Sequence, residues 1–104
     1  MLNNIVLVGR LVNEPTIEEM EDGKKVTTIK LAVNRNFKNV DGIYETDFIP
    51  CILWNSVAAT TTEYCHIGDV IGVKGRIQSN EDKSIVVVAE RVTFLSSKKD
   101  NEEE

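Results

Sequence analysis

The sequence predicts an all-β domain with one short helix, organised as a five-stranded barrel. Apolar and polar residues alternate over most of the chain, and this period of two is typical of half-buried strands. Asp22-Gly23 and Asp41-Gly42 are hairpin signals, because glycine accepts the positive φ of a tight turn. Glycines also stand inside predicted strands, at Gly9, Gly72 and Gly75, where a closing barrel needs bulges and sharp bends.

Five segments have strand patterns. The second segment alternates most cleanly, because Ile29, Leu31 and Val33 share one face while the residues between them share the other. The fourth and fifth segments are joined by the short polar link QSNEDK, which suits a hairpin. The predicted strands are residues 3–12, 24–35, about 46–54, 69–77 and 84–95.

The segment NSVAATTTEYCHIG, residues 55–68, predicts a short helix between the third and fourth strands. Asn55 or Ser56 can cap its start and Gly68 suits its end. Its three threonines lower helix propensity, so we expect packing to hold this helix in place. Five strands in this order with one helix are typical of the Greek-key oligonucleotide-binding barrel, the OB-fold. A plain five-stranded meander or sandwich is the alternative.

Composition places the chain among ordinary globular domains. Its 104 residues suit one core, and its longest apolar runs fall far short of the roughly 20 residues of a membrane helix. Cys51 and Cys65 have no C-x-x-C spacing, so we expect both thiols to be reduced and buried. The chain opens without a basic-then-apolar leader. We therefore expect a cytoplasmic protein with no membrane partner.

The charge is unevenly distributed along the chain. The formal net charge is -5, but residues 14–22 hold five anions and no cation, and residues 98–104 hold four anions and two cations. Outside these two segments 10 cations face 8 anions. A local field can differ in sign from the whole-protein charge, so the acidic total does not exclude nucleic acid as a partner. A merely solvated charged surface is the competing interpretation.

Three aromatic residues have the spacing of a base-stacking surface. Phe48 and Trp54 are six residues apart on one strand, so they share the face opposite the aliphatic residues that would fill the barrel. Phe37 follows the second strand, in the loop that leads back to the third. Bases of every sequence can stack on such rings. Burial in the core is the alternative, above all for Phe48. Tyr64 and Phe94 are interpreted as packing residues.

Cations near these rings are candidates for phosphate contacts. Arg35 and Lys38 are the leading candidates, because they flank Phe37 within the segment NRNFK. Such residues act as charges that displace condensed counterions and need no fixed geometry. The full set of candidates is Arg10, Lys30, Arg35, Lys38, Lys74 and Arg76.

Catalytic and metal-binding patterns are weak in this sequence. His66 is the only histidine, and no hydrolase, zinc-protease or P-loop motif occurs. A zinc site formed by Cys51, Cys65 and His66 would need a fourth ligand and lacks a recognised spacing. We therefore expect a binding protein, with no cofactor and no metal, rather than an enzyme.

Four separated blocks resemble the successive blocks of bacterial and phage single-stranded DNA-binding proteins, up to about Leu95. The blocks are MLNNIVLVGRLVNEP, TIKLAVNRNFKN, ETDFIPCILWNSVA and EYCHIGDVIGVKGRI. The resemblance implies an OB-fold domain over residues 1–97, with a short charged and disordered tail over 98–104. It implies coating of single-stranded DNA during replication, repair or recombination, with Phe37, Phe48 and Trp54 stacking on bases.

The resemblance also implies self-assembly. The usual assembly in the family is a homotetramer, and the branched residues of strand one suggest pairing across a dimer axis. Residues 98–104, KKDNEEE, lack the terminal proline or phenylalanine of the family's acidic tip, so recruitment of replication and repair proteins stays open. Two other functions compete. One is a primosomal accessory OB-fold protein that acts through protein contacts, and the other is a pure interaction domain with Phe37 and Trp54 as a hot spot.

Overall fold

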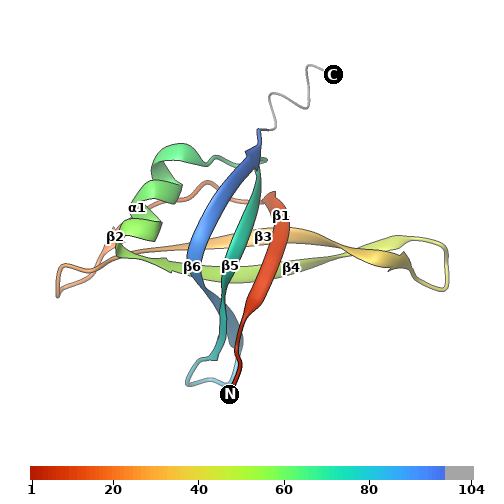
Figure 1. The fold of residues 1–104 in the computed structure, drawn as a ribbon, viewed down its shortest axis with the longest axis horizontal. Helices are drawn as coiled ribbons and strands as arrows, with labels where there is room; N and C mark the ends of the chain where they lie inside the picture. Colours follow the sequence, from red (N-terminus) through yellow and green to blue (C-terminus); the bar gives the residue numbers. More distant parts are fainter. Residues whose placement is uncertain (98–104) are drawn as a thin grey trace.

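The computed structural model describes residues 1–97, so the disordered tail expected over residues 98–104 lies outside the described part. Residues 1–97 form six strands and one helix (Figure 1). The elements in chain order are β1 (Ile5–Leu11), β2 (Glu18–Glu19), β3 (Lys25–Lys38), β4 (Tyr44–Trp54), α1 (Asn55–Tyr64), β5 (Val70–Ser79) and β6 (Ile85–Ser96).

The five long strands close into a barrel. The sheet order is β1-β5-β6-β4-β3-β2, and β1 also pairs with β3 through Arg10 opposite Ala32 and Leu11 opposite Leu31. This extra pairing joins the first and last of the five long strands in the sheet order, and β4 runs parallel to β6. The predicted five-stranded barrel with a helix between the third and fourth long strands is therefore confirmed. In a meander or an open sandwich, β1 and β3 would not pair with each other.

The core fills the barrel with the residues that strand alternation predicts. On β3, Ile29 and Leu31 are fully buried whereas Lys30 between them is exposed. Cys51 and Cys65 are both buried and unpaired, as expected. Burial raises the pKa of the Cys51 thiol to about 11 and also raises the pKa of Cys65. Both sulfurs are therefore protonated and unreactive near neutral pH. The largest fully buried side chains are Leu11, Ile29, Leu31, Leu53, Ile71, Val73 and Cys51.

Two of the three strand glycines occupy positions that exclude a side chain. A Cβ at Gly75 would lie 2.1 Å from the carbonyl oxygen of Val88, and one at Gly9 would lie 2.8 Å from the carbonyl oxygen of Ala32. The register of β5 against β6 shifts between Lys74 and Gly75, which is the bulge expected of a closing barrel. Gly72 is different, because a Cβ there would lie 3.8 Å from Leu95 Cδ1, which is an ordinary van der Waals distance.

The helix differs from the prediction at both ends. Trp54 occupies the N-cap position and no side chain caps the helix. Asn55 has φ 52 and its Oδ1 accepts a hydrogen bond from the Lys25 N–H at 3.2 Å, so its amide ties α1 to β3 instead. The helix ends at Tyr64, and Gly68, with φ +92, shapes the later turn into β5.

Tyr64 and Phe94, which the sequence indicated as packing residues, are not buried. Tyr64 on α1 is 62% exposed and Phe94 on β6 is 47% exposed. The buried residues of the helix are Ala58 and Thr61, which are small enough for α1 to pack close to the barrel.

The hairpin of β3 and β4 extends well beyond the barrel (Figure 1). We call residues 34–47 the arm. Its turn is held by Asn39, whose Oδ1 accepts the backbone N–H groups of Asp41 at 2.9 Å and Ile43 at 3.0 Å. Gly42 in this turn has φ 78, as the Asp-Gly dipeptide predicts. Both strands run further into the arm than alternation indicated, since β3 ends at Lys38 and β4 begins at Tyr44.

Candidate nucleic-acid interface

The outer face of β3 and β4 carries two of the three candidate stacking residues. Directly opposite residues of an antiparallel pair share a face, and Ala32 lies opposite Phe48 while Val26 lies opposite Trp54. Phe48 is 59% exposed. The alternate residues of β4, Cys51 and Leu53, are completely buried. Phe48 and Trp54 thus share the face that points away from the core.

Trp54 and Phe37 have different environments. Trp54 is only partly exposed, because it lies opposite the buried Val26 and directly before α1. Phe37 is 66% exposed. Between the pairs Asn34–Thr46 and Lys38–Tyr44, three residues of β3 oppose the single residue Glu45 of β4, so Phe37 lies in a bulge. Phe48 and Phe37 therefore expose larger fractions of their surface than Trp54.

A shallow groove lies between Phe48 and Trp54 on this face. Its volume is about 390 Å³. Asn13 shapes one wall, since its side chain accepts the Lys30 N–H at 2.8 Å and donates to the Thr28 carbonyl at 3.3 Å. Lys30 is exposed and lies opposite Pro50, which places a cation midway along the aromatic face. The groove is lined by Val12, Asn13, Thr28, Ile29, Lys30 and Pro50.

Arg10 completes a row across three strands. It lies opposite Ala32 on β3, which in turn lies opposite Phe48 on β4. The small side chain of Ala32 leaves the space between cation and ring open. Arg10 Nη1 donates to the Gly68 carbonyl at 2.5 Å, which fixes the guanidinium at the edge of the face while Arg10 itself stays exposed.

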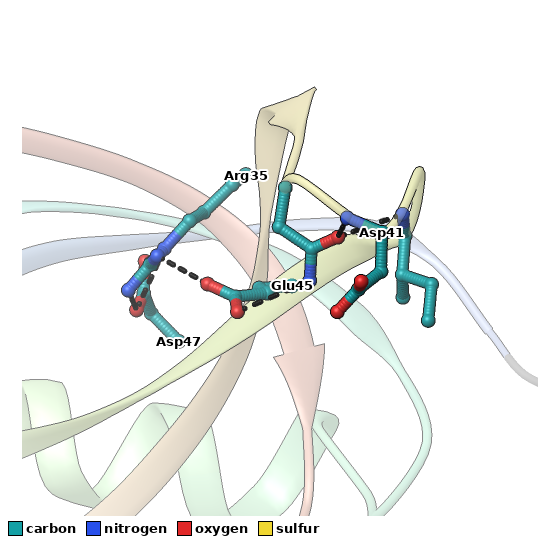
Figure 2. A network of polar contacts seen from close by, with 6 residues as sticks. Arg35, Asp41, Glu45 and Asp47 are labelled. Atoms are coloured by element: carbon teal, nitrogen blue, oxygen red, sulfur yellow. Dashed lines mark hydrogen bonds and ion pairs between the residues drawn. The ribbon is translucent and has the colours of Figure 1, made fainter.

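Arg35 is held by two carboxylates of the arm. Figure 2 shows its guanidinium between Asp47 and Glu45. Nη2 lies 2.9 Å from Asp47 Oδ1, and Nη1 lies 2.5 Å from Glu45 Oε2. The hydrogen bonds that Arg35 donates to Asp47 are the main cause of its raised pKa, and they in turn lower the pKa of Asp47. The charge of Arg35 is therefore compensated within the chain.

Lys38 has a different partner. Its Nζ lies 5.6 Å from the centre of the Tyr44 ring, directly across the strand pair. Within residues 1–97, Lys38 makes no ion pair with a carboxylate. Of the two leading cations in NRNFK, Lys38 thus keeps an uncompensated charge and Arg35 does not.

Lys74 and Arg76 lie on β5, which pairs with neither β3 nor β4. Lys74 lies opposite Val6 on β1 and opposite Arg91 on β6. Arg76 lies opposite Val88, in a row that continues to Ile52 on β4, and its Nη1 donates to Gln78 Oε1 at 3.0 Å. Arg76 thus lies nearer to the aromatic face than Lys74.

A polar latch joins the loop after β1 to the loop after α1. Glu14 Oε1 lies 2.7 Å from His66 Nδ1, and Glu14 Oε2 accepts the Ile67 N–H at 2.7 Å. The Ile67 hydrogen bond, followed by that of His66, lowers the pKa of Glu14. The hydrogen bond to Glu14 raises the pKa of His66. The histidine of the rejected zinc hypothesis thus has a structural partner, and residues 1–97 contain no cluster of three or more possible metal ligands.

Sequence reasoning missed two features of this surface. Tyr44 was not singled out, although it is in phase with Phe48 on an alternating strand. The compensation of Arg35 was also missed, although Glu45 and Asp47 alternate with Tyr44, Thr46 and Phe48 in the segment YETDF. Extending the third strand by two residues would have placed both carboxylates on the face of Arg35. No helix among the described residues is long and apolar enough to cross a membrane.

The closed barrel, the position of its helix and the aromatic outer face of β3 and β4 place the chain in the OB-fold class. Residues 2–95 match the Single-strand binding protein family, and the chain belongs to this family.

Relatives of the chain are found in several bacteria. Single-stranded DNA-binding protein B of Bacillus subtilis is 41% identical over 106 residues, covering 94% of each chain. Single-stranded DNA-binding protein 3 of Listeria innocua is 42% identical over 106 residues, covering 94% of this chain and 66% of that protein. The single-stranded DNA-binding protein of Enterococcus faecalis is 48% identical over 79 residues, covering 76% of this chain but only 42% of its own length.

Proposed function

We propose that this chain binds single-stranded DNA without sequence preference and protects it during replication, repair or recombination. The observation that carries the proposal is the exposed Phe48 on the outer face of β3 and β4, in phase with Trp54 and flanked by the groove. An exposed phenylalanine on a sheet loses the burial that normally stabilises it. Stacking on unpaired bases would recover that burial.

The face supplies the two interactions that a flexible single strand needs. Phe48, Trp54 and Phe37 would stack on bases along one strand, and uncompensated cations would neutralise the phosphates between them. Lys30 and Arg10 lie nearest to Phe48, and Lys38 lies on the arm. Arg76 and Lys74 would contact a strand that continues around the barrel. We propose that Arg35 chiefly positions the arm, because its charge is compensated.

We further propose that the protein self-assembles through β1. From Ile5 to Gly9 this strand pairs only with β5 within the described part of the chain. Val6 and Val8 on its outward face are 72% and 55% exposed. An unpaired edge with exposed branched residues favours pairing with a second copy. The relationship to the family favours a tetramer, and a dimer is the smaller assembly compatible with this edge. Light scattering should therefore give a mass of at least twice 11.7 kDa, and a monomer would contradict this proposal.

Two further features bear on the biological setting. The unpaired thiols of Cys51 and Cys65 fit a reducing cytoplasm. The uncompensated cations around the aromatic face favour DNA binding over a primosomal accessory role or a pure protein-docking role. Contacts with replication and repair proteins would be made in addition to DNA binding.

The experiment compares Phe48→Ala with Tyr64→Ala in the full chain, with oligothymidine as the ligand. Both residues are exposed, at 59% and 62%, but Tyr64 lies on α1 away from the face. Loss of one stacked base should weaken binding roughly 5- to 150-fold for Phe48→Ala. Tyr64→Ala should bind as the parent does. Equal affinities for all three proteins would refute the proposed face.

A further inference from the structure

We propose that Tyr44 and Lys38 form an additional base-binding subsite on the arm, which extends the DNA track beyond Phe48. This inference rests on the proposed function, since it adds one nucleotide position to the same face. Its ligand is a single unpaired base with the phosphate next to it.

The register of the arm places both residues on the face of Phe48. Tyr44, Thr46 and Phe48 alternate along β4 and so point to one side. The bulge in β3 changes the pairing from Asn34–Thr46 to Lys38–Tyr44. Its two extra residues leave Lys38 opposite Tyr44 and therefore on the same side. The bulge thus brings a cation to a ring at the far end of the aromatic face.

The Tyr44 ring is available for stacking. Tyr44 is 55% exposed, close to the 59% of Phe48. The Lys38 ammonium lies 5.6 Å from the ring centre, near the outer limit of a cation–π contact. The ring face away from Lys38 can receive a base, and the ammonium lies within reach of the adjoining phosphate. An aromatic ring beside an uncompensated cation is the pairing that single-stranded nucleic acid requires.

Two of the three acidic residues of the arm, Glu45 and Asp47, lie on its other side. Glu45 and Asp47 alternate with Tyr44 and Phe48, and both are held by Arg35. Asn39 Nδ2 also donates to Glu45 Oε1 at 3.3 Å. The carboxylates of Glu45 and Asp47 thus point away from the track, and Figure 2 shows both of them beside the Arg35 guanidinium. The same bonds hold the arm in shape, so little order would have to be gained on binding.

The spacing suits an extended strand of nucleotides. Tyr44 and Phe48 are four residues apart on β4, which is about 13 Å at the usual rise of a strand. Between them Thr46 Oγ1 donates to Asn34 Oδ1 at 2.8 Å, so the side chains between the two rings are polar and uncharged. A polynucleotide can cross this stretch from one ring to the next.

The test uses the full chain, a length series of fluorescein-labelled oligothymidines and three variants. Tyr44→Ala should weaken binding of long oligomers roughly 5- to 150-fold, and Tyr44→Phe should restore it. Ile43→Ala is the matched control, because Ile43 is 60% exposed in the same hairpin and out of phase with the track. The loss in Tyr44→Ala should vanish for oligomers too short to reach from the Phe48–Trp54 face to the arm. Melting curves should show that every variant is folded.

The outcomes separate this inference from the function on which it rests. If Phe48→Ala weakens binding while Tyr44→Ala binds long oligomers as the parent does, the subsite is refuted and the proposed function stands. If neither Phe48→Ala nor Tyr44→Ala weakens binding, both the subsite and the proposed function are refuted. If Tyr44→Ala and Ile43→Ala lose affinity equally, the effect belongs to the shape of the hairpin, and the subsite is again refuted.

Discussion

Lys38 and Arg35 lie three residues apart, yet the structure predicts opposite roles for them in DNA binding. The Lys38 ammonium lies 5.6 Å from the centre of the Tyr44 ring and makes no ion pair within residues 1–97, whereas the Arg35 guanidinium is compensated by Asp47 and Glu45. A cation contributes to binding by releasing a counterion from the phosphate that it neutralises. Replacing Lys38 with glutamine should therefore remove one phosphate contact, and replacing Arg35 with glutamine should remove none.

The magnitude follows from the charge count. Each phosphate contact on a single strand adds about -0.7 to the slope of log affinity against log salt. Over a fourfold rise in salt, one such contact changes affinity by roughly 2.6-fold. Lys38→Gln should flatten the slope by about 0.7, and Arg35→Gln should leave it unchanged. Arg35→Gln should instead lower the melting temperature slightly, because Asp47 and Glu45 then repel each other without a cation between them.

The assay is fluorescence anisotropy of labelled oligothymidine at several salt concentrations, with the parent protein and both variants measured side by side. Lys24→Gln is the control, because Lys24 is exposed and paired with Asp22 in the distant β2–β3 turn. A flattened slope for Arg35→Gln with an unchanged slope for Lys38→Gln would refute the assignment of charges on the arm.

Two further predictions concern stability. The raised pKa of His66 contributes stability that is present below its ordinary value of 6.5 and is lost as the pH rises through the raised value. The lowered pKa of Glu14 contributes stability that is present above 4.5 and is lost as the pH falls through the lowered value. The melting temperature of the parent should therefore exceed that of His66→Gln most clearly between about pH 4.5 and 6.5, and a difference that grows above pH 8 would contradict the latch. Gly75→Ala should destabilise the fold by about 1 to 3 kcal/mol in urea titrations, because its Cβ would lie 2.1 Å from the Val88 carbonyl oxygen; an unchanged midpoint would show that the bulge can relax.

Most of the barrel could be predicted because strand alternation and glycine are local signals. The burial of Ile29 and Leu31 and the bulge at Gly75 follow from sequence spacing alone. The helix start could not be predicted, because Asn55 has a better partner in the Lys25 N–H than in its own helix. That partner lies 30 residues away in the chain, and capping rules consider only neighbours.

The aromatic face was predictable in part. Phe48 and Trp54 share a face because six residues separate them on one strand, which the sequence shows. The degree of exposure of each ring is not a local property. Trp54 is partly covered because β3 places Val26 opposite it, whereas the small Ala32 leaves Phe48 open. The bulge that brings Lys38 opposite Tyr44 has no sequence signal, since it depends on how two strands register across the arm.

Trp54 provides the most direct test of the proposed interface, because it is the only tryptophan of the chain and lies on the outer face of β4. The measurement is its fluorescence emission during titration with oligothymidine, with duplex DNA as the competitor. We predict quenching that saturates at a fixed number of nucleotides per protomer and that duplex DNA reverses poorly, since paired bases cannot stack on the ring. Emission that stays unchanged while oligothymidine binds, or equal competition by duplex DNA, would contradict base stacking on this face.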